Sequence, residues 1–390
     1  MKILLSIIMY FYALFFLFIV ILIYPIFKIK IGNIQSRTIG NGSIAYEIFY
    51  YEMKEKDLKK KNEFYIWFTE KKISNKFIIK KFKENFSIIP GVFLFSPFIL
   101  IKKLKLNFLL VPIENKKFLN RDDNEVLIRY PKLINFNQSE ISYAQKICKI
   151  FDIKDEDKII CASARTSKFY NEKFKSNQNA DINSYYKSFK YLTDNDYKVI
   201  LIGDNYENLP NNSNDKIIPY SNSEYKNSML DFYLMSRASF FIQSPSGIGE
   251  IAAMMRIPRL IVNFWGLETL ITYAENSVQL IIPKKVTIKK ENKQIHYLDL
   301  TKKMFNVKTN TYRIFNYNEM DKVGYNVEDN SADEILDGVK EIKKMVENKN
   351  SIKKNKQLFW DHYNQIFVNK KINKVRIVDS FYRKNLHLFE

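Results

Sequence analysis

Residues 240–266 read FFIQSPSGIGEIAAMMRIPRLIVNFWG, and this stretch indicates the fold class. An apolar segment ends at Gln243, a Ser-Pro-Ser-Gly turn follows, and an alanine-rich helical segment leads to a second apolar segment that ends at Asn263. Strand, turn, helix and strand in this order predict a βαβ unit with parallel strands. Because the strands are continuous apolar runs, we expect a sheet that is covered by helices on both faces.

Strands and helices alternate on both sides of this unit. The expected strands cover 63–69, 86–90, 158–164, 197–203, 216–220, 238–244, 258–264 and 278–283. The expected helices cover 43–61, 74–85, 181–195, 227–237 and 331–348, with Ser74 as the N-cap of the second. The alternation predicts a parallel α/β chain with two domains, at 31–150 and 151–345, and a basic helical tail at 346–390.

The amino terminus has a different composition. Residues 3–27 read ILLSIIMYFYALFFLFIVILIYPIF and contain no charged side chain. About 20 apolar residues can span a bilayer, so we expect a transmembrane anchor at 1–30. An uncleaved secretion signal or a buried helix are the alternatives. Basic residues follow the span, which predicts one pass through the cytoplasmic (inner) membrane with the rest of the chain in the cytoplasm.

The chain is strongly basic, with 62 Lys and Arg against 42 Asp and Glu and a net charge of +20. That excess predicts an anionic partner: nucleic acid, an acidic membrane surface or a phosphorylated substrate. No nucleic-acid-binding signature accompanies the basic runs, so we interpret them as solvated helix faces beside an anionic membrane. The two cysteines, Cys148 and Cys161, are expected in the core.

Three loops follow predicted strands and meet at one edge of the expected sheet. They contain Arg165, the pair Gly203-Asp204 and the turn 244–250. Ligands of open parallel sheets bind beyond the carboxyl ends of the strands. A Ser-Gly turn that opens a helix offers free N–H groups to an anion, with Ser246 adding a hydroxyl and arginine a guanidinium fork. The alternative is a plain tight turn, with serine as N-cap.

Two other motifs have weaker support. GIGEIA fits a dinucleotide fingerprint, but the next strand ends at Asn263, where an acidic residue is expected for the ribose. The Asp194-Asn195-Asp196 run resembles a metal-binding Asp-x-Asp motif, but it precedes the strand at 197–203 and so belongs to the opposite edge of the sheet. We interpret it as a solvated turn and expect no metal site.

Residues 158–266 resemble a family of bacterial surface-polysaccharide glycosyltransferases, and more distantly fucosyltransferase-like and heptosyltransferase-like enzymes. The likeness rests on SARTSKFYN, QNADI, NDYKVILIGD, LDFYL, SPSG and IPRLIVN, which occur in the family's order. Weaker likeness extends over most of 28–390, including RTIGNGSIAYE. The chain departs from the family where Ser163 and Thr166 replace a histidine and an aspartate.

The resemblance implies two Rossmann-like domains of the GT-B type, a metal-independent hexosyl or deoxyhexosyl transfer, and no cofactor besides the nucleotide-sugar donor. The acceptor, a glycan or a lipid-linked glycan, would bind 31–150, where Glu47 is our candidate general base. Arg165 would stabilise the leaving diphosphate. A catalytically degenerate binding or scaffold protein is the alternative. The expected donor-binding residues are Arg165, Tyr170, Asn179, Asp181, Gly203, Asp204, Ser244, Ser246, Gly247, Glu250 and Asn263.

Overall fold

The computed structural model forms two compact units, Met1–Asn135 and Phe136–Glu390. The division precedes the boundary expected at 150/151, because helix α6 (Gln138–Ile150) packs on α8 (Ser228–Arg237) within the second unit. The structure describes residues 2–40, 42–55, 62–115, 122, 124–166, 176–203, 205–206, 209, 214–267, 279–306, 311–312, 317–348, 357–366 and 375–390.

The amino-terminal unit is built on a parallel three-stranded sheet in the order β1-β2-β3. Trp67 and Phe68 are neighbours on β2 and point to opposite faces. Trp67 packs against Tyr46 of α2, and Phe68 packs against Phe98 of α4. Helices therefore cover both faces. The elements are α1 (Lys2–Ile23), β1 (Lys28–Ile34), α2 (Ile44–Glu55), β2 (Glu63–Thr69), α3 (Lys76–Phe82), β3 (Ser87–Ile89), α4 (Gly91–Lys103) and α5 (Val126–Arg129).

Helix α1 lies against the protein along one stripe. Ala13, Leu17 and Val20 recur at helical spacing and are buried with α4 and the sheet. Among the described residues, no helix is long and apolar enough to cross a membrane. The transmembrane anchor expected at 1–30 is therefore not found: α1 is instead one of the helices that pack on the first sheet.

The second unit contains a seven-stranded sheet in the order β15-β9-β8-β7-β4-β5-β6, with every described pair parallel. The chain runs outward from β4 through β5 to β6, and then returns to build the other half from β7. Neighbours β4 and β7 therefore form the point where the strand order reverses. The strands are β4 (Lys158–Ser163), β5 (Tyr197–Leu201), β6 (Ile217–Ile218), β7 (Ala238–Gln243), β8 (Arg259–Phe264), β9 (Gln279–Pro283) and β15 (Val375–Ile377).

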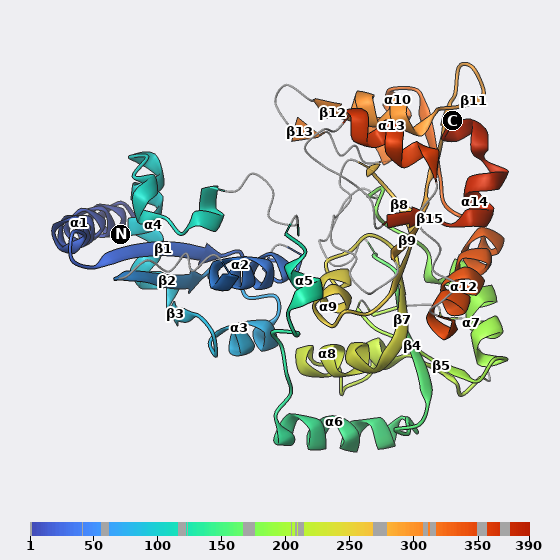
Figure 1. Cartoon of the computed structure of the whole chain (residues 1–390), viewed down its shortest axis with the longest axis horizontal. Helices are drawn as coiled ribbons and strands as arrows, with labels where there is room; N and C mark the ends of the chain where they lie inside the picture. The colour runs from blue at the N-terminus through green and yellow to red at the C-terminus, as the bar shows by residue number, and fades with distance from the viewer. Residues whose placement is uncertain are drawn as a thin grey trace. The chain divides into compact units, whose positions relative to one another are not determined.

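Helices cover both faces of this sheet, as its continuous apolar strands predicted (Figure 1). On one side lie α7, α12 and α14, with α12 in contact with β7, β8 and β9; on the other lie α8 and α9. Ser331 caps α12 in a capping box with Glu334. The helices are α7 (Tyr186–Thr193), α9 (Gly249–Met254), α10 (Tyr297–Met304), α11 (Tyr317–Lys322), α12 (Ala332–Glu347), α13 (Leu358–Ile366) and α14 (Asp379–Lys384).

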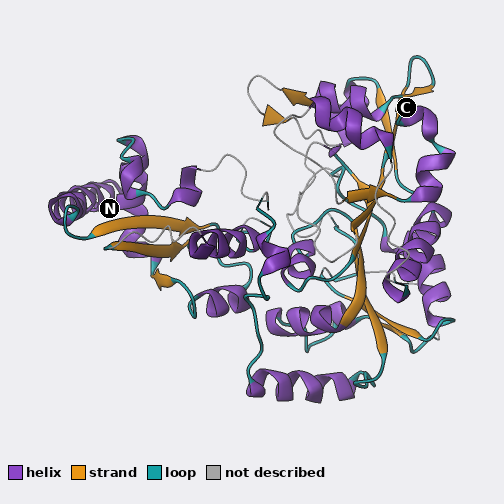
Figure 2. Cartoon of the chain, viewed as in Figure 1, coloured by secondary structure: helices purple, strands orange, loops and turns teal. Residues whose placement is uncertain are grey.

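The remaining strands are short (Figure 2). β10 (Lys285–Ile288) pairs with β11 (Lys293–Gln294) and with β14 (Tyr325–Glu328), while β12 (Phe305–Asn306) pairs with β13 (Thr311–Tyr312). The segment expected as a separate tail joins the second unit, because β15 pairs with β9. The N-cap of α3 is Asn75, whose side chain accepts a hydrogen bond from Ile78, in place of the expected Ser74.

Candidate functional site

The reversal point of the large sheet brings two predicted loops together. Ser163 at the end of β4 is level with Gln243 at the end of β7. One residue further on, the Ser244 hydroxyl accepts a hydrogen bond of 2.8 Å from the backbone N–H of Arg165. The Ser244 N–H donates in turn to the Ser163 carbonyl, at 3.3 Å. Arg165 and the Ser-Pro-Ser-Gly turn therefore belong to one site, as the carboxyl-end rule predicted.

The Arg165 guanidinium is held in a fixed orientation. Its Nη1 donates to Ser176 Oγ at 2.7 Å and to Gln178 Oε1 at 3.1 Å. Both acceptors are neutral, so the positive charge is oriented without being neutralised by these contacts. Tyr170, another predicted donor-binding residue, lies in 167–175, outside the described residues.

The turn after β7 differs in detail from the expected helix start. Helix α9 begins at Gly249 and has six residues, and its N-cap position is Ile248, which makes no side-chain cap. The N–H groups of Gly249 and Glu250 are already bonded to the carbonyls of Ser246 and Gly247. Available donors for an anion therefore belong to the turn itself and not to the first turn of the helix.

Ser246 and Gly247 supply hydrogen-bond donors of this turn that the described protein does not use. Its hydroxyl oxygen is buried and has no hydrogen-bond partner among the described residues. The backbone N–H groups of Ser246 and Gly247 likewise find no acceptor within the described part of the chain. A buried hydroxyl without a partner is costly, and a ligand oxygen would satisfy both it and the neighbouring N–H groups. These groups are the strongest local signal for an anionic ligand.

Two glycines at this edge are required by packing. A Cβ on Gly249 would lie 2.4 Å from the side-chain amide atoms of Gln243, so this glycine lets α9 approach the end of β7. Gly203 has φ of +93°, and a Cβ there would lie 2.8 Å from Ser163 Oγ. The sequence suggested that the turn 244–250 lies against an anionic ligand. At Gly249 the close neighbour is instead the Gln243 side chain of the protein itself. Asp204 lies outside the described residues.

A lysine that the sequence reasoning missed lies at the same edge. Lys284 follows β9 directly, and its side chain is completely buried. Its ammonium donates to the Asn179 carbonyl at 3.0 Å and to the Tyr317 hydroxyl at 2.5 Å, and forms an ion pair with Asp329. The rule that found Arg165 would also have found Lys284, because 278–283 was a predicted strand.

Several predicted donor-binding residues have structural contacts. The side-chain oxygens of Asn263 and Asn330 each accept a hydrogen bond from the other's backbone N–H, at 2.6 and 2.5 Å. Asn263 also has φ of +52°, a conformation that asparagine tolerates. Asp181 is exposed and caps the short helix that begins at Ile182. Glu250 is buried on α9. Their roles toward a donor stay predictions.

Glu47 lies in the interior of the amino-terminal unit. It is on the first turn of α2, its side chain is completely buried, and its Oε1 accepts a hydrogen bond of 3.0 Å from the Leu133 N–H. This contact ties α2 to the end of its unit and gives the carboxylate a structural function. Its role as a general base stays a prediction.

The described residues contain no group of three or more His, Cys, Asp and Glu side chains that could hold a metal ion. Asp194 and Asp196 lie between α7 and β5, at the amino edge of the sheet, where they form ion pairs with Lys190 and Lys216. Their interpretation as a solvated turn is confirmed. Cys148 and Cys161 are buried free thiols, as expected.

A cavity of about 900 Å³ lies in the amino-terminal unit, at the amino end of its sheet. Aliphatic and aromatic side chains from α1, α2 and all three strands surround it, among them Ile23, Phe49 and Trp67. Phosphate recognition needs donors and positive charge, and this lining is mostly apolar. The cavity therefore does not fit a nucleotide diphosphate, and the carboxyl edge of the large sheet is the better anion site.

Comparison with known proteins gives distant similarity. No protein-family model matches the chain, and neither does any curated protein. Similar solved structures include ADP-heptose lipopolysaccharide heptosyltransferase II of E. coli, with TM-score 0.37 and 12% identity over 60% of this chain and 84% of that one. A glycosyl transferase family 9 protein of Veillonella parvula gives 0.38 and 9%, over 60% and 80%. MnaA of S. aureus, solved with UDP, gives 0.31 and 11%, over 60% and 79%.

The chain itself is an α/β fold with parallel sheets, and its similarity to these structures is distant. Similarity at TM-scores below 0.5 carries no inference about the reaction, so the residues at the reversal point have to support any function. The names of these proteins mention ADP-heptose and UDP as molecules that they act on or bind.

Proposed function

We propose that the chain is a glycosyltransferase of GT-B type that binds a nucleotide-sugar donor at the carboxyl edge of the seven-stranded sheet. The observation that carries the proposal is the meeting of two loops at this edge: the backbone N–H of Arg165 bonds to Ser244, and the Ser246 hydroxyl in the same turn is buried without a partner among the described residues. A diphosphate presents the several anionic oxygens that such a set of donors accommodates. Preorganised donors stabilise charge that develops on the leaving diphosphate without a reorganisation cost.

The sugar would pass, without a metal ion, to a glycan or lipid-linked acceptor held by the amino-terminal unit. The proposed transferred group is a hexosyl or deoxyhexosyl residue. The proposed process is surface-polysaccharide synthesis at the cytoplasmic membrane. Glu47 remains the proposed general base, and Lys284 joins the proposed donor site through its contact with the Asn179 carbonyl. No nucleic acid is part of the proposal.

A catalytically degenerate binding protein is the second candidate, and one observation favours it. Ser163 stands where the resembling family has a histidine, and its hydroxyl lies 3.3 Å from the Tyr206 hydroxyl in a buried position. Serine at this position supplies no group that titrates near neutral pH. Donor binding without turnover would support this candidate over the enzyme.

Ligand-dependent thermal stability tests the donor site. A ligand that binds only the folded state at 100 times its Kd stabilises it by about 2.7 kcal/mol. We expect one nucleoside diphosphate among ADP, GDP, UDP and CDP to raise the midpoint, and Arg165→Ala to abolish that rise. Arg256→Ala is the matched control, because Arg256 precedes β8 at the opposite edge of the sheet and contacts the carbonyls of Ala253 and Met254.

Turnover is measured separately, as release of the nucleoside diphosphate from the sugar nucleotide that binds. Release that requires an added glycan or lipid-linked acceptor would support a transferase. Binding without release over a range of acceptors would favour the degenerate candidate. A panel in which no nucleotide shifts the midpoint, or an Arg165→Ala variant that keeps the full shift, would contradict the proposed site.

A further inference from the structure

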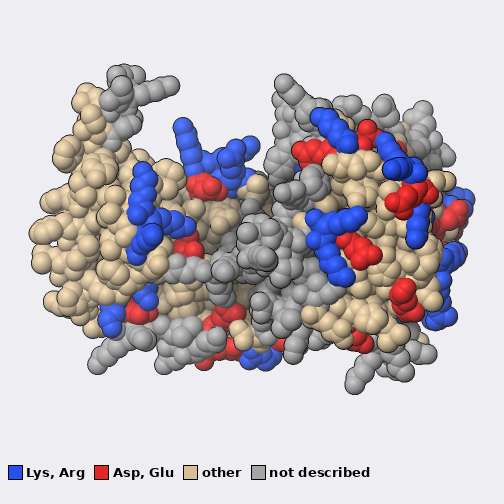
Figure 3. Space-filling model, turned by 90° about the horizontal axis from the view of Figure 1, so that it is seen from above, with Lys and Arg blue, Asp and Glu red and all other residues tan. Residues whose placement is uncertain are grey.

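An uncovered apolar face dominates the surface of the amino-terminal unit. All but six of the large hydrophobic side chains that are exposed in the described residues lie between Leu4 and Phe108. Monomeric soluble proteins rarely expose contiguous apolar patches larger than a few hundred Å². In Figure 3 the end of this unit, at left, is a broad surface with few charged side chains, and Lys and Arg side chains border it.

Helix α1 contributes two apolar stripes on opposite sides. The inner stripe, with Ala13, Leu17 and Val20, is at most 3% exposed and packs on the protein. The outer stripe consists of Phe11, Phe15, Phe18 and Leu22, which recur at helical spacing and are each 65–66% exposed. A helix that is apolar on every side needs an apolar neighbour on every side, and the described protein supplies only one.

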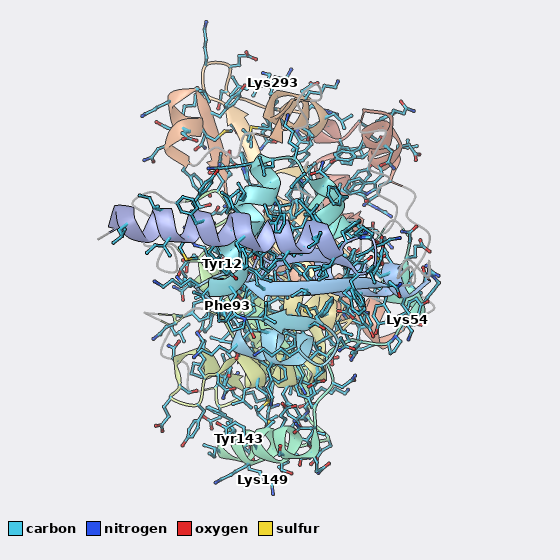
Figure 4. All side chains as sticks on the ribbon, turned by 90° about the vertical axis from the view of Figure 1, so that its left-hand side faces the viewer. Tyr12, Lys54, Phe93, Tyr143, Lys149 and Lys293 are labelled. Atoms are coloured by element: carbon cyan, nitrogen blue, oxygen red, sulfur yellow. The ribbon has the colours of Figure 1, made fainter. Side chains whose placement is uncertain are left out.

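Helix α4 extends the face. Figure 4 shows α1 lying along the strands of this unit, with Tyr12 and Phe93 labelled. The Tyr12 hydroxyl donates to the Phe93 carbonyl at 2.9 Å, and the two helices are in contact. Val92, Phe93 and Phe95 on α4 are 53–65% exposed. We call the exposed apolar side chains of α1 and α4 the apolar face.

Charge selects the occupant of this face. No Asp or Glu occurs in residues 1–46 or 91–113, which together supply both helices. Lys103 and Lys105, at the end of α4, are exposed. A second copy would bring a like-charged rim against this one, which is repulsive, whereas basic residues near the surface attract anionic lipid headgroups.

The cavity of about 900 Å³ adjoins this face. Phe27 and Phe64 line it, are about half exposed, and have ring centroids 5.9 Å apart. Ile23 at the end of α1 and the exposed Lys54 also line it. An apolar hollow with a cation at its border matches the flexible chain and anionic headgroup of a lipid better than a rigid protein partner.

We propose that the apolar face inserts into the interface of an anionic bilayer, with α1 and α4 lying in the plane of one leaflet. The outer stripe enters the boundary between headgroups and acyl chains, while the inner stripe stays packed on the sheet. Lys103 and Lys105 contact the headgroups. This inference does not depend on the proposed enzymatic activity, since it concerns a different unit and a different ligand.

Co-sedimentation of the full-length chain with vesicles tests the inference. We expect strong binding to vesicles of phosphatidylcholine with one-third phosphatidylglycerol, and weaker binding to phosphatidylcholine alone. Phe11→Ser, Phe15→Ser and Phe18→Ser combined should reduce partitioning at least tenfold. The matched control replaces three exposed apolar residues from elsewhere in the chain, as Ile128→Ser, Ile150→Ser and Leu386→Ser, and should bind like the wild type.

A charge variant keeps the test decisive should the serine variant fold poorly. The double variant Lys103→Glu and Lys105→Glu should abolish the preference for phosphatidylglycerol. The control is the double variant Lys290→Glu and Lys293→Glu, which should preserve this preference. It makes the same change in net charge at exposed positions of the other unit. Circular dichroism verifies folding of each variant.

Three results would overturn the inference. The first is no binding of the wild type to anionic vesicles. The second is equal binding by a folded serine variant. The third is a wild-type dimer that the serine replacements dissociate while vesicle binding is absent, which would assign the face to self-association. A loss of donor binding in the nucleotide experiment would leave all of these readouts unchanged.

Discussion

Replacement of Asp231 by asparagine is expected to stabilise the protein at neutral and alkaline pH. Asp231 is on α8, and its Oδ1 is buried without a hydrogen-bond partner among the described residues. Burial raises the pKa of this carboxyl from 3.8 to about 6, against a smaller opposing effect of the Lys226 charge and the Tyr220 hydroxyl. The folded state therefore holds the proton more tightly than the unfolded chain.

The sign and size follow by linkage. Because the folded pKa is raised, the stabilisation is present below about pH 4 and is lost as the pH rises through about 6. A difference of roughly 2 pKa units at 1.36 kcal/mol each amounts to about 3 kcal/mol at pH 8. The asparagine side chain cannot ionise, so Asp231→Asn should equal the wild type near pH 4 and exceed its stability by up to about 3 kcal/mol at pH 8.

Urea unfolding between pH 4 and pH 8 measures this difference. Two of the three tryptophans, Trp265 and Trp360, are buried in the second unit, so tryptophan fluorescence reports largely on the unit that contains Asp231. Glu341, whose pKa burial raises to about 7, is common to both proteins and cancels in the comparison. Asp194→Asn, at a carboxylate that is 57% exposed, is the control for removal of one carboxylate and should not reproduce the gain in stability at pH 8. A variant that is less stable at pH 8, or a gain that is the same at every pH, would contradict this account of Asp231.

Comparing Gly203→Ala with Gly324→Ala separates the cost of backbone strain from the cost of steric overlap. Both glycines have positive φ, but only at Gly203 would a new Cβ overlap another atom, Ser163 Oγ. Thermal unfolding should show a cost of about 1–2 kcal/mol for Gly324→Ala and a clearly larger one for Gly203→Ala, and equal costs would mean that the Ser163 contact is unimportant. Glu47→Leu should lose about 1–3 kcal/mol, because the buried Leu133 N–H loses its acceptor, whereas Glu47→Gln should retain most of that stability. Loss of turnover in a stable Glu47→Gln variant would show a catalytic role, and full turnover would remove Glu47 as the base.

Local composition was enough to predict most elements of the large sheet and the edge at which the candidate site lies. Continuous apolar runs located β4, β5, β7, β8 and β9 within two residues, because strand formation in a covered parallel sheet depends on local composition and length. Because these strands run parallel, the residues that follow them all lie at the same edge of the sheet. For this reason the sequence alone placed Arg165 and Ser244 together.

The contacts that those residues make depend on tertiary packing. The hydrogen bond between Arg165 and Ser244 requires β4 and β7 to be neighbours, although 79 positions separate the two residues. The same kind of long-range packing brings the Lys284 ammonium to the Asn179 carbonyl and the Glu47 carboxylate to the Leu133 N–H. Composition could not settle α1, because an apolar helix is equally compatible with hydrocarbon and with a protein core. Its packing on α4 on one side, with Phe15 exposed on the other, comes from the tertiary fold alone.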